Sequence, residues 1–210
     1  DLERIVAMQP DLIIVWQDGN AQRQLERLLS MGIPAYYNEP RSLTDIARSI
    51  EQFGRMAGSE AVAQPAADAF RRRESALRAR FSNRAAVRVF YQVWEKPLIT
   101  VSGRHIISDM INLCGGKNVF ADLKPLAPVI STEAVIAANP EAIGGASTDP
   151  GAPRSFANWR KWPRMLAVQR DNLFLIHPDL ISRHTPRMLD AVQILCEQID
   201  RARNKRQNGK

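Results

Sequence analysis

Two tryptophans follow stretches that predict β-strands, at positions where open α/β sheets bind their ligands. Trp16 ends the run Leu12–Trp16 and precedes a glycine-containing turn at Gln17–Asn20, and Trp94 ends the run that starts at Val87. An indole beyond the carboxyl end of a parallel strand can lie flat on a ligand and donate its N–H. Either tryptophan could instead be a core residue, but two exposed ones would enclose a large planar molecule.

Residue patterns typical of enzymes do not stand out. The three histidines, His105, His177 and His184, have no metal-ligand spacing with one another or with the cysteines. There is no Ser/His/Asp order, Gly-rich phosphate loop or pair of carboxylates. Gly115-Gly116 follows a predicted helix rather than a strand, so it is a helix stop. No residue pattern therefore points to catalysis, and we expect no metal ligand and no cofactor.

Composition allows one large α/β domain or two small lobes. The chain has 210 residues, of which 45% are hydrophobic and 24% charged, an ordinary globular balance. No apolar run approaches the roughly 18 residues of a membrane-spanning helix. The net charge of +7 permits an anionic partner. However, many cations fall in a polar tail that we expect to be frayed, or on the solvated face of one helix, so we expect no nucleic-acid partner.

Strand-like and helical stretches alternate, which predicts a parallel sheet with right-handed crossovers. The first part holds a helix from Asp1 to about Met8, strand Leu12–Trp16, helix Ala21–Met31, strand Ile33–Tyr37 and helix Ser42–Met56. The second part holds strand Val87–Trp94, helix His105–Cys114, helix Glu133–Ala138, strand Ala142–Gly144, a segment around Trp159 and Trp162, strand Leu173–Ile176 and a helix from Pro186 to about Arg201. Phe90 and Tyr91 point to opposite faces of their strand, and both can be core residues.

A long Ala- and Arg-rich helix separates these two parts. It runs over Ser59–Phe81, longer than a normal crossover, and Pro65 could separate or kink its first turn. We divide the chain into an N-terminal lobe (1–57), a linker helix (58–83), a C-terminal lobe (84–203) and a basic tail (204–210). The expected fold is α/β, with two Rossmann-like lobes joined by one long helix. Only two strands precede the linker, so the first lobe is expected to be incomplete.

An internal similarity supports two related lobes. Residues 1–13 align without a gap with residues 131–143, at a constant offset of 130. Glu3 matches Glu133, Pro10 matches Pro140, and an acidic residue follows each proline. Any helix–proline–strand unit could look similar, which is the alternative. A chain that opens on a helix cap, with the first lobe short, leads us to expect an N-terminal truncation.

Four segments, in order along almost the whole chain, resemble the helical-backbone substrate-binding proteins of ABC importers, and more closely the periplasmic cobalamin-binding proteins. The segments are DLERIVA with PDLIIVWQDGN (residues 1–20), VFYQVW (89–94), LCGGKNVF (113–120) and DLISRHTPR (179–187). Gly144-Gly145 departs from the aliphatic strand that such proteins would have there. The resemblance implies a periplasmic monomer that captures a corrinoid in a cleft between its lobes and delivers it to an importer permease, meeting the membrane only through that transporter.

The resemblance also implies residue roles. Trp16 and Trp94 would contact the corrin faces, while Asp179 and Arg183 would bind its amide-bearing rim. The spacing of Asp179 and Arg183 is equally that of a local ion pair, and both interpretations can hold.

Glu3 and Glu133 would dock the two lobes onto permease arginines, and their local alternative is a favourable interaction with the helix dipole. Cys114 and Cys196 would form a disulfide in an oxidising compartment, and their alternative is a pair of buried thiols.

Two other functions stay open at this point. One is a receptor of the same fold for haem or a ferric siderophore. The other is a chelatase or metal-cluster enzyme on a similar two-lobe scaffold, which would need Cys or His ligands in the cleft.

Overall fold

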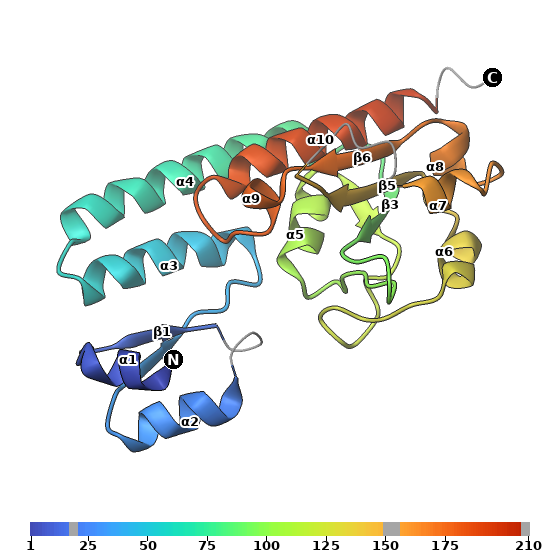
Figure 1. Cartoon of the computed structure of the whole chain (residues 1–210). Helices are drawn as coiled ribbons and strands as arrows, with labels where there is room; N and C mark the ends of the chain where they lie inside the picture. Colours follow the sequence, from blue (N-terminus) through green and yellow to red (C-terminus); the bar gives the residue numbers. More distant parts are fainter. Residues whose placement is uncertain (17–20, 149–155, 207–210) are drawn as a thin grey trace. The chain divides into compact units, whose positions relative to one another are not determined.

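A computed structural model describes residues 1–16, 21–148 and 156–206 and contains two compact units, Asp1–Pro40 and Arg41–Lys210 (Figure 1). The turn expected at Gln17–Asn20 lies outside the described residues. Among the residues that are described, no helix has both the length and the apolar composition needed to cross a membrane. The division expected at residues 57, 83 and 203 stays a prediction.

The first unit is a pair of parallel strands with two helices. Its elements are α1 (Leu2–Ala7), β1 (Ile13–Val15), α2 (Gln22–Ser30) and β2 (Ala35–Tyr37). Ile13 pairs with Ala35 in the parallel register. Leu25 and Leu28 are the buried residues of α2, and the turn after the helix contains Gly32, whose φ of 83° an L-residue rarely adopts. The helices and strands lie where the sequence predicts them.

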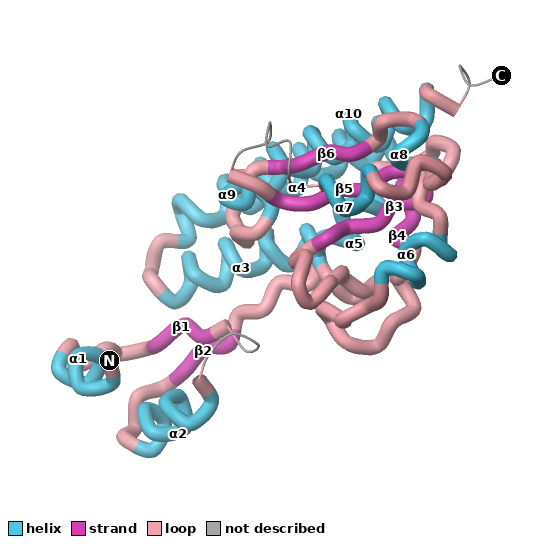
Figure 2. The backbone as a smooth tube through the Cα atoms, turned by 45° about the vertical axis from the view of Figure 1, so that its right-hand side comes forward, coloured by secondary structure: helices cyan, strands magenta, loops and turns pink. Residues whose placement is uncertain are grey.

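The second unit contains a four-stranded sheet, and all its strands are parallel, which confirms the α/β class (Figure 2). The strand order is β4-β3-β5-β6. The elements are α3 (Leu43–Met56), α4 (Glu60–Phe81), β3 (Val87–Gln92), α5 (Ile106–Leu113), β4 (Gly116–Asn118), α6 (Thr132–Ala138), β5 (Ala142–Ala146), α7 (Ala157–Arg160), α8 (Leu166–Gln169), β6 (Leu173–Ile176), α9 (Pro178–Ile181) and α10 (Met188–Asn204).

Side chains of β3 alternate between two hydrophobic clusters. Val87, Val89 and Tyr91 belong to the cluster that includes residues of α3, α4, α5 and α10. Phe90 points the other way and packs with Trp159 and with residues of α6 and α8. Phe90 and Tyr91 are thus both core residues, as one interpretation of the sequence allowed. The helices form a layer on each face of the sheet (Figures 1 and 2).

The long helix α4 is continuous from Glu60 to Phe81, so Pro65 does not separate its first turn. It packs along α3 in an antiparallel pair (Figure 1). Several of its arginines form ion pairs rather than a purely solvated face. Arg71 lies 2.6 Å from Glu51 of α3, and Arg73 lies 2.6 Å from Asp190 of α10.

The glycine pair of β5 has a steric reason. A Cβ on Gly144 would lie 2.7 Å from the ring of Phe174, and one on Gly145 would lie 3.2 Å from the ring of Phe156. Both distances are closer than ordinary carbon contacts. The pair therefore lets aromatic rings of neighbouring segments approach the central strand, where an aliphatic sequence would not fit.

The internal similarity extends to helix capping. Asp1 accepts the backbone N–H of Arg4 at 3.1 Å, and Ser131 accepts that of Ala134 at 3.2 Å. Each capped helix is followed by proline and a strand, β1 in one unit and β5 in the other.

The last helix and the basic tail differ from expectation. α10 begins at Met188 rather than Pro186, because Pro186 and Arg187 form a turn that the Met188 N–H closes by donating to the Thr185 carbonyl at 2.9 Å. The helix continues to Asn204, and the following side chains are held rather than frayed. Lys205 donates to the Arg170 carbonyl at 2.6 Å, and Arg206 binds the carboxylate of Glu141. Residues 207–210 lie outside the described part of the chain.

Candidate functional site

Trp16 stands at the carboxyl end of β1 in the first unit. The residue directly follows Val15, the last strand position, and its side chain is 52% exposed. It is therefore not a core tryptophan. Its indole can contact a ligand at the strand end where open α/β sheets place their binding sites.

Trp94 follows β3 in the second unit and is also exposed, at 61%. Its backbone pairs with Ile99, whose N–H donates to the Trp94 carbonyl at 3.0 Å. The indole Nε1–H donates to the carbonyl of Lys96 at 2.9 Å. Because this N–H is used inside the loop, Trp94 offers a ligand the apolar face of its ring rather than a hydrogen bond.

A pocket of about 490 Å³ opens at the carboxyl end of β3, and its lining includes Gln92 and the loop residues Glu95–Leu98 but not Trp94 itself. Gln92 and the indole of Trp159 form part of its wall, joined by a 2.6 Å hydrogen bond from Nε1 to Oε1. Trp162, 44% exposed, adds an aromatic surface. Trp159 and Trp162 belong to a segment that the sequence predicts without assigning it a role in binding. Two indoles within four residues after a central strand were the available signal for a site.

Asp179 and Arg183 form the ion pair that their spacing allowed. Oδ1 of Asp179 lies 2.9 Å from Nη2 of Arg183, and both side chains are substantially exposed. Asp179 belongs to the short helix α9, directly after β6, and its backbone N–H donates to Nδ1 of His177 at 3.2 Å. A guanidinium carries five donors and a carboxylate can accept several bonds, so the pair keeps capacity for a ligand.

Glu3 and Glu133 are exposed and lie in the first turns of α1 and α6. Hydrogen bonds from the Glu133 backbone N–H and from the Ser131 hydroxyl lower the pKa of the Glu133 carboxyl. Both positions agree with the helix-dipole interpretation and leave the carboxylates open to a protein surface.

A sequence profile described as periplasmic binding protein matches residues 1–180. The chain belongs to the periplasmic binding protein family. Members of this family are substrate-binding proteins rather than enzymes.

Within this family the chain is similar to the vitamin B12-binding protein of Vibrio parahaemolyticus. The two are 40% identical over 206 residues, which cover 98% of this chain and 74% of the relative. The fold of this chain is also similar to the crystal structure of the periplasmic vitamin B12 binding protein of Vibrio cholerae, with a TM-score of 0.86 and 35% identity. The match covers 96% of this chain and 78% of that one. The periplasmic haem-binding protein of Roseiflexus sp. RS-1 shares the fold alone, with a TM-score of 0.80 and 20% identity over 96% of this chain and 80% of that one.

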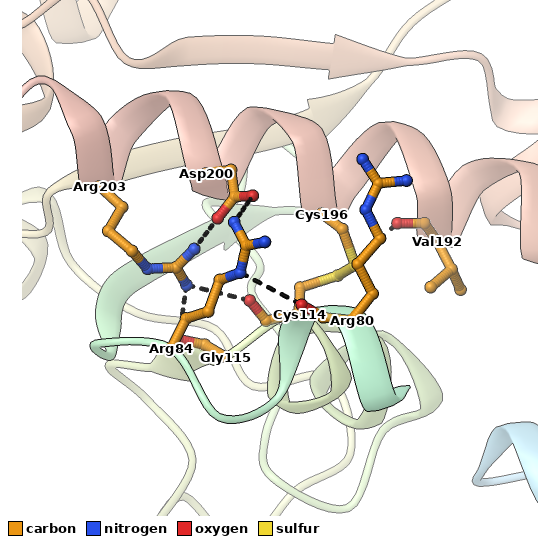
Figure 3. The surroundings of a disulfide bond; sticks show 8 residues. All are labelled: Arg80, Arg84, Cys114, Gly115, Val192, Cys196, Asp200 and Arg203. Carbon is orange, nitrogen blue, oxygen red and sulfur yellow. Dashed lines mark hydrogen bonds and ion pairs between the residues drawn. A yellow bond between two sulfur atoms is a disulfide. The ribbon is translucent and has the colours of Figure 1, made fainter. Parts of the chain in front are cut away.

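This family member contains the disulfide that the resemblance implied. Cys114 at the end of α5 is bonded to Cys196 of α10, and both are fully buried (Figure 3). Arg203 lies nearby on α10 and donates to the carbonyls of Cys114 and Gly115 at 3.1 and 3.3 Å. The bond and the guanidinium together join the last helix to the end of α5.

Two of the histidines in the described part of the molecule accept hydrogen bonds from backbone N–H groups two residues further along the chain. Nδ1 of His105 accepts the backbone N–H of Ile107 at 3.1 Å, and that of His177 accepts from Asp179. Burial, and then the neighbouring His184, lower the pKa of His105 to about 4. Within the described ranges, no three His, Cys, Asp or Glu side chains are grouped as metal ligands.

Proposed function

We propose that this protein captures cobalamin, or a closely related corrinoid, in the periplasm and delivers it to the permease of an ABC importer. The observation that carries the proposal is the 40% identity, over 98% of the chain, with a vitamin B12-binding protein. The site geometry supports it, because an exposed indole follows a parallel strand in each unit. Broad apolar ring surfaces suit a large flat ligand.

The aromatic residues would contribute to affinity by burying the apolar faces of the corrin against their rings. Trp16 and Trp94 are large exposed side chains whose apolar area is removed from water when a ligand covers it. Trp162, which lines the pocket at the carboxyl end of β3, would add a further aromatic surface. Because the Trp94 indole N–H is already bonded to Lys96, its contribution is contact rather than polarity.

Asp179 and Arg183 would bind the amides around the corrin rim. A carboxylate accepts amide N–H groups and a guanidinium donates to amide carbonyls. Their mutual 2.9 Å ion pair orients both groups before the ligand arrives, so less side-chain entropy is lost on binding.

Delivery would use Glu3 and Glu133. Each is an exposed acid on the first turn of a helix, and the two belong to separate units. Arginines on a permease would bind such carboxylates through charge-assisted hydrogen bonds. The proposal includes a monomeric receptor, no resident cofactor and no catalytic step.

Calorimetric titration with cyanocobalamin tests the proposal, with haemin and a ferric siderophore as comparators. Saturable binding of cyanocobalamin, and much weaker binding of both comparators, is the expected result. Tight binding of haemin or the siderophore without cyanocobalamin binding would replace the proposal with a receptor for an iron complex. The fold likeness to haem-binding proteins does not distinguish these ligands.

A further inference from the structure

The ring of His177 caps the short helix that carries Asp179. Its Nδ1 accepts the Asp179 backbone N–H at 3.2 Å, as the N-cap of α9. A ring nitrogen that accepts a hydrogen bond carries no proton, so the ring is neutral in this arrangement and its N–H is on Nε2. The cap therefore depends on the protonation state of His177.

The same ring nitrogen is close to the carboxylate of Asp179. The distance from Nδ1 to Oδ2 is 3.9 Å, and the side chains of His177 and Asp179 are 41% and 45% exposed. Arg183 is paired with the other carboxylate oxygen, Oδ1. Oδ2 is thus the oxygen that the arginine leaves for a ligand, and it lies beside the imidazole.

We propose that His177 is a positioning residue that offers the Asp179 carboxylate to the ligand when neutral and withholds it when protonated. A neutral ring holds the Asp179 N–H and leaves Oδ2 open. One proton taken from solvent converts Nδ1 from an acceptor to a donor, so the cap is lost and Nδ1–H turns to Oδ2. The inference rests on the proposed function, since it takes Asp179 as a ligand contact.

Other charged or titratable groups around α9 lie on α10 and in the loop after α9. The first turn of α10, the helix packed on α9, contains Asp190, which lies 2.6 Å from Arg73. Arg187 is the exposed cap residue of α10. His184 lies in the loop after α9, where burial lowers its pKa. Among the described side chains, the ion-pair partner recorded for the His177 ring is Asp179.

His105 provides a matched comparison. It also caps a helix through Nδ1, with a 3.1 Å bond from the Ile107 N–H, but burial lowers its pKa to about 4. That cap therefore persists in mildly acidic solution. The two histidine caps are alike in geometry and differ in their exposure to solvent.

The test compares cyanocobalamin dissociation constants at about pH 8 and about pH 5.5, a range in which exposed imidazoles titrate. The unmodified chain should bind about fivefold to tenfold more weakly at the lower pH, the effect of losing one ordinary hydrogen bond. In His177→Thr, whose hydroxyl caps without titrating, the ratio of the two constants should be close to one. His105→Thr should retain the ratio of the unmodified chain. Each ratio compares the dissociation constants of one variant at the two pH values, so a change in affinity that is the same at both pH values cancels.

An equal ratio in His177→Thr and the unmodified chain, or no pH dependence in the unmodified chain, overturns the inference. A titration of the ligand-free chain by NMR gives a second measurement that needs no variant. The Asp179 amide resonance should move with the His177 ring, and an amide that does not respond also overturns the inference. If cyanocobalamin fails to bind at about pH 8, the proposed function fails, while the ligand-free titration still decides the role of His177.

Discussion

Gln9 and Asn139, 130 positions apart, both adopt a left-handed backbone conformation immediately before a proline. Their φ angles are 47° and 43°. Each residue closes the turn between a capped helix and a parallel strand, in separate units. Neither is glycine, the residue that adopts this conformation most readily, so the similarity of the two segments extends to an uncommon backbone geometry.

Glycine should therefore have opposite effects at these two positions. Gln9→Gly relieves an unfavourable conformation and should stabilise the fold by about 0.5–1 kcal/mol. Asn139→Gly should destabilise it by about 1 kcal/mol, because Asn139 Oδ1 accepts the Leu166 N–H at 2.9 Å. Urea denaturation measures both changes in stability. Hydrogen exchange of the β1 and β5 amides shows which of the two units is affected. Shifts of the same sign would contradict the account.

Removing either exposed indole should weaken ligand binding. Trp16→Ala and Trp94→Ala should each raise the cyanocobalamin dissociation constant by the equivalent of about 1–3 kcal/mol, the scale of a desolvated aromatic anchor. Trp94→Phe should keep most of the affinity, since the indole N–H is bonded to Lys96 within the protein. Val62→Ala on α4 is the control, because Val62 is apolar and 74% exposed. Unchanged affinity in both folded alanine variants would contradict the proposed contacts.

Docking and capture should be separable. Glu3→Ala and Glu133→Ala should leave cyanocobalamin affinity unchanged and reduce transporter-dependent uptake by about tenfold, through lost charge complementarity with the permease. Glu60→Ala is the matched control, since Glu60 is also an exposed acid in the first turn of a helix. Uptake in reconstituted vesicles and calorimetry measure the two quantities. Lost ligand binding with normal docking would reverse the assignment.

Local patterns predicted most elements of this fold, and non-local contacts account for what was missed. Ser42 and Asp45 form the capping box that opens α3, a signal readable within four residues. β4 has no such signal, because Gly116-Lys-Asn118 lacks the β-branched or aromatic residues of a typical strand and is recognised by its pairing with β3. The contacts of Arg206 in the basic tail could not be predicted from local patterns either, since its partner Glu141 is 65 positions away. The disulfide followed from a family resemblance rather than from any residue pattern.

Acid should destabilise the fold through His105. Burial holds the pKa of this imidazole at about 4, below its usual 6.5, so the unfolded chain takes up a proton in that interval and the folded chain does not. The free energy of unfolding should therefore decrease as the pH falls from about 6.5 to about 4. His105→Asn, which can still cap α5, should flatten this part of the profile. An identical slope in His105→Asn and the unmodified chain would remove His105 as the cause.

The disulfide should contribute strongly to stability without being the sole connection between α5 and α10. Cys114 and Cys196 are 82 positions apart, so their bond removes about 4–5 kcal/mol of loop entropy from the unfolded chain in the simple model. Arg203 also joins the two helices, and Figure 3 shows Asp200 between the guanidinium groups of Arg203 and Arg84. Cys114→Ala/Cys196→Ala should therefore fold with a lower urea midpoint.

Adding Arg203→Met to the cysteine double variant should cost more stability than Arg203→Met costs alone, because each connection limits separation of the helices when the other is lost. Thiol titration of periplasmically produced protein, denatured without reductant, checks the bond itself and should find no reactive thiol. Two reactive thiols would count against both the bond and the oxidising compartment. Strictly additive losses would instead show that Arg203 and the disulfide stabilise the second unit independently.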